Sequence, residues 1–132
     1  MSKSYDNTIE IFGAEKEMRK KIMKIVTDST PVEAPKNPET CNVFALYKLV
    51  ATPEQTEALR QRYLAGGMGY GEAKQKLFEA YWEFFRPFRQ RREELLADPG
   101  RVEQVLQQGA RQAREVADAT LAAVKQAVGL TP

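Results

Sequence analysis

The 132-residue chain contains no histidine and a single cysteine, Cys41. A lone cysteine cannot form a disulfide within the chain. Without histidine, the common zinc and iron–sulfur sites are also excluded, so we expect no metal site. The absence of histidine removes the usual general base near neutral pH and every serine–histidine or cysteine–histidine nucleophile pair. These absences argue against a self-contained hydrolase, and we interpret Cys41 as a structural thiol.

Long hydrophobic runs are absent as well. No window holds eighteen uninterrupted apolar residues, and no apolar run follows a basic N-terminus. We therefore expect no membrane span, no secretory signal and no membrane partner. Apolar residues make up 42% of the chain and charged residues 29%, with eight glycines and seven prolines. This composition is typical of a single globular domain.

Helical periodicity dominates what is present. No stretch alternates as a half-buried strand does, and Pro31, Pro35 and Pro38 indicate one extended surface loop. Asn42 is the predicted N-cap of the helix after this loop. The expected helices cover residues 14–26, 42–50, 52–65, 71–96 and 98–129. The sequence therefore predicts an all-α bundle of about five helices, with no Rossmann domain.

Local signals mark the helix ends. Thr52 followed by Gln55 three residues later is a capping-box pattern. Asp98 is placed to cap the last helix at its start, and Gly129 is placed to end it. Pro87 interrupts the expected 71–96 helix and is predicted to kink or split it.

Positive charge is concentrated in one part of the chain. The net charge is only +2, but residues 60–92 carry eight Lys or Arg against three acids. This local excess suits a polyanion partner. The alternative is an ordinary solvated helix face, which most charge clusters are. The cations are Arg60, Arg62, Lys74, Lys76, Arg86, Arg89, Arg91 and Arg92.

An aromatic segment lies in the same stretch. Tyr81, Phe84 and Phe88 follow helical spacing, which predicts that they belong to the core. Trp82 and Phe85 fall outside that stripe, and we expect them to be exposed. An exposed ring can stack on an unpaired base of RNA.

Four arginines accompany the aromatic residues and, with Trp82, are the candidate RNA-binding residues: Arg86, Arg89, Arg91 and Arg92. Guanidinium groups pair well with phosphates because their fork of N–H donors matches the phosphate oxygens. The alternatives are pairing with neighbouring glutamates along the helix and plain solvation.

Four short motifs, taken together, indicate the protein family that the chain resembles. The chain begins Met-Ser-Lys-Ser, and it later contains Asn-Val-Phe-Ala-Leu-Tyr at 42–47, Gly-Tyr-Gly-Glu-Ala-Lys at 69–74 and Gly-Ala-Arg-Gln-Ala-Arg at 109–114. In this order, and over essentially the whole chain, they resemble the C-terminal part of the bacterial tryptophanyl-tRNA synthetases, which are class I aminoacyl-tRNA synthetases. In that family, a Lys-Met-Ser-Lys-Ser loop closes over ATP.

The resemblance implies ATP binding by Ser2, Lys3 and Ser4 in the parent enzyme, which uses ATP with magnesium. Lys3 matches the second lysine of the loop, the catalytic one, whose ammonium would stabilise charge on the departing pyrophosphate. The loop's first lysine, the nucleotide-binding α/β domain and the tryptophan pocket have no counterpart in these residues. We therefore expect this chain alone to be inactive and to hold no cofactor.

The resemblance also implies an organisation and a set of partners. Residues 1–13 would be a remnant of the ATP-binding loop, 14–30 a basic connecting helix, 31–41 a Pro-rich loop and 42–130 a C-terminal helical tRNA-binding domain. The partners would be tryptophan tRNA, held at its anticodon end, and the catalytic domain that precedes this region. The parent enzyme would be a cytoplasmic homodimer.

Without that domain, we expect the apolar side chains of Met18, Ile22 and Ile25 to be exposed, and self-association of the chain would bury them. Two further interpretations of the sequence remain open. One is a standalone helical tRNA-binding accessory module, and the other is a helical protein-interaction domain with no RNA role.

Overall fold

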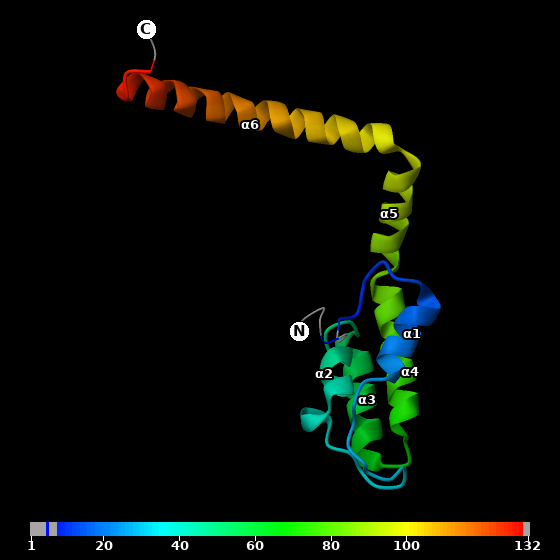
Figure 1. The fold of residues 1–132 in the computed structure, drawn as a ribbon. Coiled ribbons are helices and arrows are strands. Elements are labelled where there is room, and N and C mark those ends of the chain that lie inside the picture. The colour runs from blue at the N-terminus through cyan, green and yellow to red at the C-terminus, as the bar shows by residue number, and fades with distance from the viewer. Residues whose placement is uncertain (1–4, 6–7, 131–132) are drawn as a thin grey trace. The chain divides into compact units, whose positions relative to one another are not determined.

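Helices are the only regular elements in the described residues, Tyr5 and 8–130, of the computed structural model (Figure 1). A short 3-10 turn, η2 (Pro38–Thr40), precedes α2. The α-helices are α1 (Glu15–Met23), α2 (Asn42–Tyr47), α3 (Pro53–Ala65), α4 (Tyr70–Phe84), α5 (Arg86–Ala97) and α6 (Pro99–Ala127). The all-α prediction is confirmed, with six α-helices within the described residues where about five were expected.

The additional helix arises because the expected 71–96 helix is divided. Helix α4 ends at Phe84, and α5 begins at Arg86 with Pro87 in its second position. Proline has no N–H, and its ring clashes with the carbonyl four residues earlier in a continuous helix. The predicted kink or split at this position is therefore confirmed.

Local signals set the ends of α3. The Thr52 hydroxyl accepts a hydrogen bond from the Gln55 backbone N–H (3.2 Å), and the Gln55 side chain accepts one from the Thr52 backbone N–H (2.9 Å). This is the predicted capping box. At the other end, Gly66 has φ +75°, and a Cβ there would lie 2.5 Å from the Glu33 carbonyl oxygen. Only glycine fits both the left-handed conformation and this close approach.

The ends of α6 are also as predicted. The Asp98 side chain accepts a hydrogen bond from the Arg101 backbone N–H (3.1 Å). Gly129 has φ 72°, and the Leu130 N–H donates to the Lys125 carbonyl (2.9 Å). This pairing is a Schellman motif, which satisfies carbonyls left unpaired at the end of a helix.

The start of α2 differs from the prediction. Cys41 occupies the N-cap position without a capping side-chain hydrogen bond, and Asn42 is the first helical residue. Cys41 is 6% exposed, and its sulfur lies 3.4 Å from the Tyr63 hydroxyl. Cys41 therefore packs in the core and does not cap α2, which agrees with its interpretation as a structural thiol.

Contacts divide the chain into two units, Met1–Arg89 and Gln90–Pro132. Every buried side chain of the described residues belongs to the first unit, in which α1 and α2 both pack against α4 (Figure 1). Its core consists of Met18, Ile22, Cys41, Val43, Phe44, Tyr47, Leu59, Tyr63, Met68, Ala73, Leu77, Phe78 and Tyr81.

Helix α1 supplies part of this core. Met18 is 1% exposed and Ile22 is fully buried, while Ile25 is partly buried against the core. The expectation that these three side chains are exposed is therefore wrong. The physical reason is that α4 covers the apolar face of α1 within the same unit.

The second unit contains the long helix α6, which has no buried side chain. Apolar residues follow one face of α6 and remain exposed, as Leu106 (62%) and Val116 (72%) illustrate. Within the described residues, no helix combines the length and the apolar character that crossing a bilayer requires.

Candidate nucleic-acid interface

The three ATP-binding residues implied by the resemblance, Ser2, Lys3 and Ser4, lie outside the described residues. Their assignment stays a prediction. Elsewhere in the described part of the chain, no three His, Cys, Asp or Glu side chains gather as a potential metal site. The candidate site residues that the structure does describe are the predicted RNA-binding residues. They lie in the aromatic–arginine segment at the end of α4 and the start of α5.

The aromatic side chains are arranged differently from the prediction. Tyr81 is buried, and its hydroxyl donates to the Glu10 carbonyl (2.6 Å). Phe84 and Phe88, also expected in the core, are 46% and 54% exposed. Trp82 and Phe85, expected at the surface, are half-buried against the core. After Tyr81, the side chains that pack against the core are therefore Trp82 and Phe85, and the predicted stripe through Phe84 and Phe88 is wrong.

Arg89 and Trp82, both predicted to bind RNA, contact each other. The Arg89 guanidinium carbon lies 3.6 Å from the centre of the Trp82 ring, and its Nη2 donates to the Trp82 carbonyl. Nη1 of Arg89 is buried without a hydrogen-bond partner in the described residues. This stacking covers one face of the indole and links α5 to the last turn of α4, which gives both side chains a structural role.

Arg86 and Arg91 remain at the surface. Arg86 pairs with Glu83 at 2.8 Å and Arg91 with Glu94 at 2.7 Å, each across one helical turn. The Arg86 side chain is 62% exposed and the Arg91 side chain 49%. Exposed pairs of this kind contribute little to stability, so a phosphate can displace the glutamate at small cost. Arg92 is exposed too.

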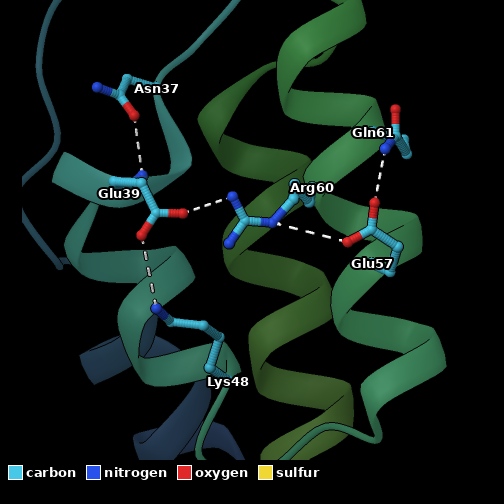
Figure 2. Close-up of polar contacts among 6 residues, drawn as sticks. All are labelled: Asn37, Glu39, Lys48, Glu57, Arg60 and Gln61. Atoms are coloured by element: carbon cyan, nitrogen blue, oxygen red, sulfur yellow. Dashed lines mark hydrogen bonds and ion pairs between the residues drawn. The ribbon is translucent and has the colours of Figure 1, made fainter.

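Arg60, the first cation of the basic stretch, is already engaged within the fold. Figure 2 shows the Glu39 carboxylate between Lys48 of α2 and Arg60 of α3, with N···O distances of 3.9 and 2.5 Å. Arg60 also reaches Glu57 (3.7 Å), and its guanidinium lies 5.4 Å from the centre of the Phe44 ring. These contacts join η2, α2 and α3, so Arg60 stabilises the first unit.

The Pro-rich loop contains a buried lysine that sequence reasoning missed. Lys36 is 3% exposed, and its Nζ donates to the carbonyls of Pro31 (2.8 Å), Ala34 (3.2 Å) and Val32 (3.4 Å). The ammonium also lies 5.3 Å from the centre of the Tyr70 ring. A loop with this many prolines makes few backbone hydrogen bonds of its own, so one buried donor that satisfies several carbonyls stabilises it. A lysine between closely spaced prolines is the signal that could have found this contact.

Next to Lys36, Asp28 connects the end of the first helical segment to α4. Its Oδ1 accepts hydrogen bonds from the Thr30 backbone N–H (2.9 Å) and the Tyr70 hydroxyl (2.8 Å). Hydrogen bonds from Thr30, and then from Tyr70, hold the pKa of Asp28 below its usual value. Burial, followed by the bond to Asp28, raises the pKa of Tyr70 to about 12. Both groups therefore keep their ordinary charge states near neutral pH, as turn and packing elements do.

Known proteins are similar to this chain over nearly its whole length. Residues 1–86 match the family model described as tRNA synthetases class I (W and Y). The chain is 47% identical over 130 residues to the tryptophan–tRNA ligase of Rhodopirellula baltica, covering 98% of this chain and 41% of that protein. It is 42% identical to the tryptophan–tRNA ligase of Fusobacterium nucleatum, covering 98% of this chain and 40% of the relative.

A solved structure agrees with these relatives. Tryptophanyl-tRNA synthetase from Campylobacter jejuni matches with a TM-score of 0.92 and 41% identity, covering 98% of this chain and 42% of that one. A second structure of the Campylobacter protein, described as complexed with ADP and tryptophan, matches with the same TM-score. The chain thus spans about two fifths of the length of the proteins it matches. On these grounds, the chain belongs to the class I tRNA synthetases of the tryptophan and tyrosine family.

Proposed function

We propose that this chain is the helical tRNA-docking region of a tryptophan–tRNA ligase, the enzyme that joins tryptophan to its tRNA with ATP. The observation that carries the proposal is the 47% identity over 130 residues to a tryptophan–tRNA ligase. Residues 42–130 would receive the anticodon end of the tRNA, and residues 1–41 would connect this region to the ATP-binding loop.

The exposed arginines are the proposed phosphate contacts. Arg86 and Arg91 are exposed, and each pairs with an exposed glutamate one turn away. Arg92 joins them on the basis of the sequence. We assign Arg89 and Trp82 to positioning this surface, because they stack on each other. The basic excess of residues 60–92 would attract the tRNA backbone over a distance of about one Debye length, roughly 8 Å at physiological salt.

The chemistry would belong to the whole enzyme. We propose that Lys3, with Ser2 and Ser4, contributes to ATP binding there, that magnesium accompanies the ATP, and that the enzyme works as a cytoplasmic homodimer. Tryptophan-dependent exchange of pyrophosphate into ATP tests the inactivity proposed for these 132 residues alone. Turnover above the background without protein would contradict it.

A salt series of binding measurements tests the docking proposal. Fluorescence anisotropy would compare the affinity of the chain for tryptophan tRNA with its affinity for an unrelated tRNA. The triple variant Arg86→Ala, Arg91→Ala and Arg92→Ala should lower the slope of log affinity against log salt by about one for each phosphate that is no longer neutralised.

Arg111→Ala is the matched control, because Arg111 is an exposed arginine outside the basic stretch. We expect this variant to keep the parent slope. Equal affinity of the parent chain for both tRNAs would rule out recognition of tryptophan tRNA by these residues. An unchanged slope in the triple variant would rule out the three arginines as phosphate contacts.

A further inference from the structure

Helix α1 carries a row of lysines that has no role in the function proposed so far. Lys16, Lys20 and Lys24 recur at every fourth residue, and all three are exposed. Lys24 is the C-cap residue of α1 and keeps a helical backbone conformation, so it continues the row. The helical rise places successive members about 6 Å apart along the axis and on one face. Arg19 is exposed beside them.

The lysine row lies on the side of α1 that faces away from the core. Met18 is 1% exposed and Ile22 is fully buried, and α1 packs against α4 through this apolar face. Lys16 and Lys20 are each two positions from Met18, which is a turn of about 200° around the helix. The apolar face of α1 is therefore occupied within the fold, and its opposite face presents the ammonium groups to solvent.

Hydrogen bonds at both ends hold α1 in place against α4, beside which it lies (Figure 1). Before α1, the Glu10 carbonyl accepts a hydrogen bond from the Tyr81 hydroxyl (2.6 Å). At its last residue, the Met23 carbonyl accepts one from the Lys74 ammonium (3.2 Å). The lysine row is thus carried by a fixed helix, which gives its charges a defined spacing.

No acidic side chain neutralises this row. Within the described residues, neither the three lysines nor Arg19 forms an ion pair. The acids of α1, Glu15 and Glu17, lie in its first turn, where the helix dipole favours negative charge. The arginines of the basic stretch differ, because four of them each pair with a glutamate: Arg60, Arg62, Arg86 and Arg91.

The chemistry of this face fits a chain of phosphates. An ammonium group is a compact point charge that binds phosphate without a fixed orientation, so a row of them can follow a nucleic-acid backbone. An anionic membrane is the other polyanion to consider. A helix that binds a membrane surface buries its apolar face among the lipids, and the apolar face of α1 is already packed against α4. The observations therefore favour RNA.

We propose that Lys16, Lys20 and Lys24 bind the phosphate backbone of the docked tRNA, as a second contact surface separate from the arginines of α5. The inference rests on the proposed tRNA docking. It adds a site on the helix that was, from the sequence, only a connection between the ATP-binding loop and the tRNA-binding domain. Because these lysines have no ion pairs to break in the described residues, phosphates reach them without displacing a carboxylate.

A salt series of anisotropy titrations with fluorescent tryptophan tRNA and the 132-residue chain tests the inference. The triple variant Lys16→Gln, Lys20→Gln and Lys24→Gln should lower the slope of log affinity against log salt by about two to three. Each phosphate that is neutralised contributes about 0.7–0.9 to that slope. The variant with arginine at the same three positions keeps the charges and should keep the parent slope. Circular dichroism and the thermal midpoint should match the parent chain, because the three side chains are exposed.

A matched control removes the same number of exposed cations from α6. The variant Arg111→Gln, Arg114→Gln and Lys125→Gln lowers the net charge equally, and we expect it to keep the parent slope. An equal decrease in both triple variants would overturn the proposal, because the affinity would then depend on total charge and not on the face of α1.

The remaining outcomes separate this proposal from tRNA docking itself. A parent slope in the α1 glutamine variant, together with a lowered slope in the variant of Arg86, Arg91 and Arg92, would overturn the lysine row and leave docking in place. Vesicles of phosphatidylcholine and phosphatidylserine are the second probe. Loss of vesicle binding with unchanged tRNA binding in the glutamine variant would assign the row to a membrane and overturn the proposal. A parent chain that binds no tRNA would overturn both proposals.

Discussion

The two units of the chain are stabilised in different ways. Residues 8–89 contain every buried side chain of the described chain, whereas residues 90–130 contain none. Helix α6 has its own caps and is 29 residues long, beyond the roughly 12–15 residues at which isolated helices become more than marginal in water. The comparison teaches that helical structure in this chain has two sources, tertiary packing in the first unit and local interactions in the second.

A core truncation should separate the two sources most clearly. Phe44 is fully buried, and its ring centre lies 5.4 Å from that of Tyr63. Phe44→Ala should lower the free energy of unfolding by about 3–5 kcal/mol, because it removes buried apolar surface and leaves a cavity. Leu106→Ala on α6 should change it by less than about 0.5 kcal/mol, because Leu106 is 62% exposed.

Urea unfolding followed by Trp82 fluorescence measures both effects, since Trp82 is the single tryptophan and stacks on Phe78 in the core. A decrease above about 1 kcal/mol for Leu106→Ala would show that the α6 face is packed in solution. The contrast between the two units would then be invalid.

Removal of the buried ammonium should have an intermediate effect. Lys36→Met removes the donor shared by the carbonyls of Pro31, Ala34 and Val32. We expect stability to fall by about 2 kcal/mol, since hydrogen bonds to charged groups contribute about 1.5–3 kcal/mol each and the freed carbonyls can partly rehydrate. Lys24→Met is the control at an exposed lysine, and should stay within about 0.5 kcal/mol of the parent chain. Equal melting of both variants would contradict a structural role for Lys36.

The sequence predicted those structural features that depend on residues close together in the chain. The capping box of Thr52, the cap at Asp98 and the split near Pro87 were each foreseen from residues within one helical turn. The burial of Met18 could not be predicted in the same way, because it depends on how α1 packs against α4. A periodic stripe states which residues share a face and leaves open which part of that face is covered.

The same limit applied to the candidate interface. Arg89 and Trp82 are seven residues apart on either side of a helix break, and their stacking could not be derived from the period of an unbroken helix. The roles of Ser2, Lys3 and Ser4 stay predictions, as do those of Arg86, Arg91 and Arg92.

The helix caps offer the smallest and most selective test of the two sources. Thr52→Ala removes one half of the capping box of α3, and should lower the stability of the first unit by about 1 kcal/mol. Asp98→Ala removes the equivalent bond at the start of α6. Because α6 has no buried side chain, this substitution should reduce helix content by circular dichroism and leave the Trp82 unfolding midpoint unchanged. If Asp98→Ala shifts that midpoint as much as Thr52→Ala does, the two units unfold together, and local capping in one contributes to the stability of the other.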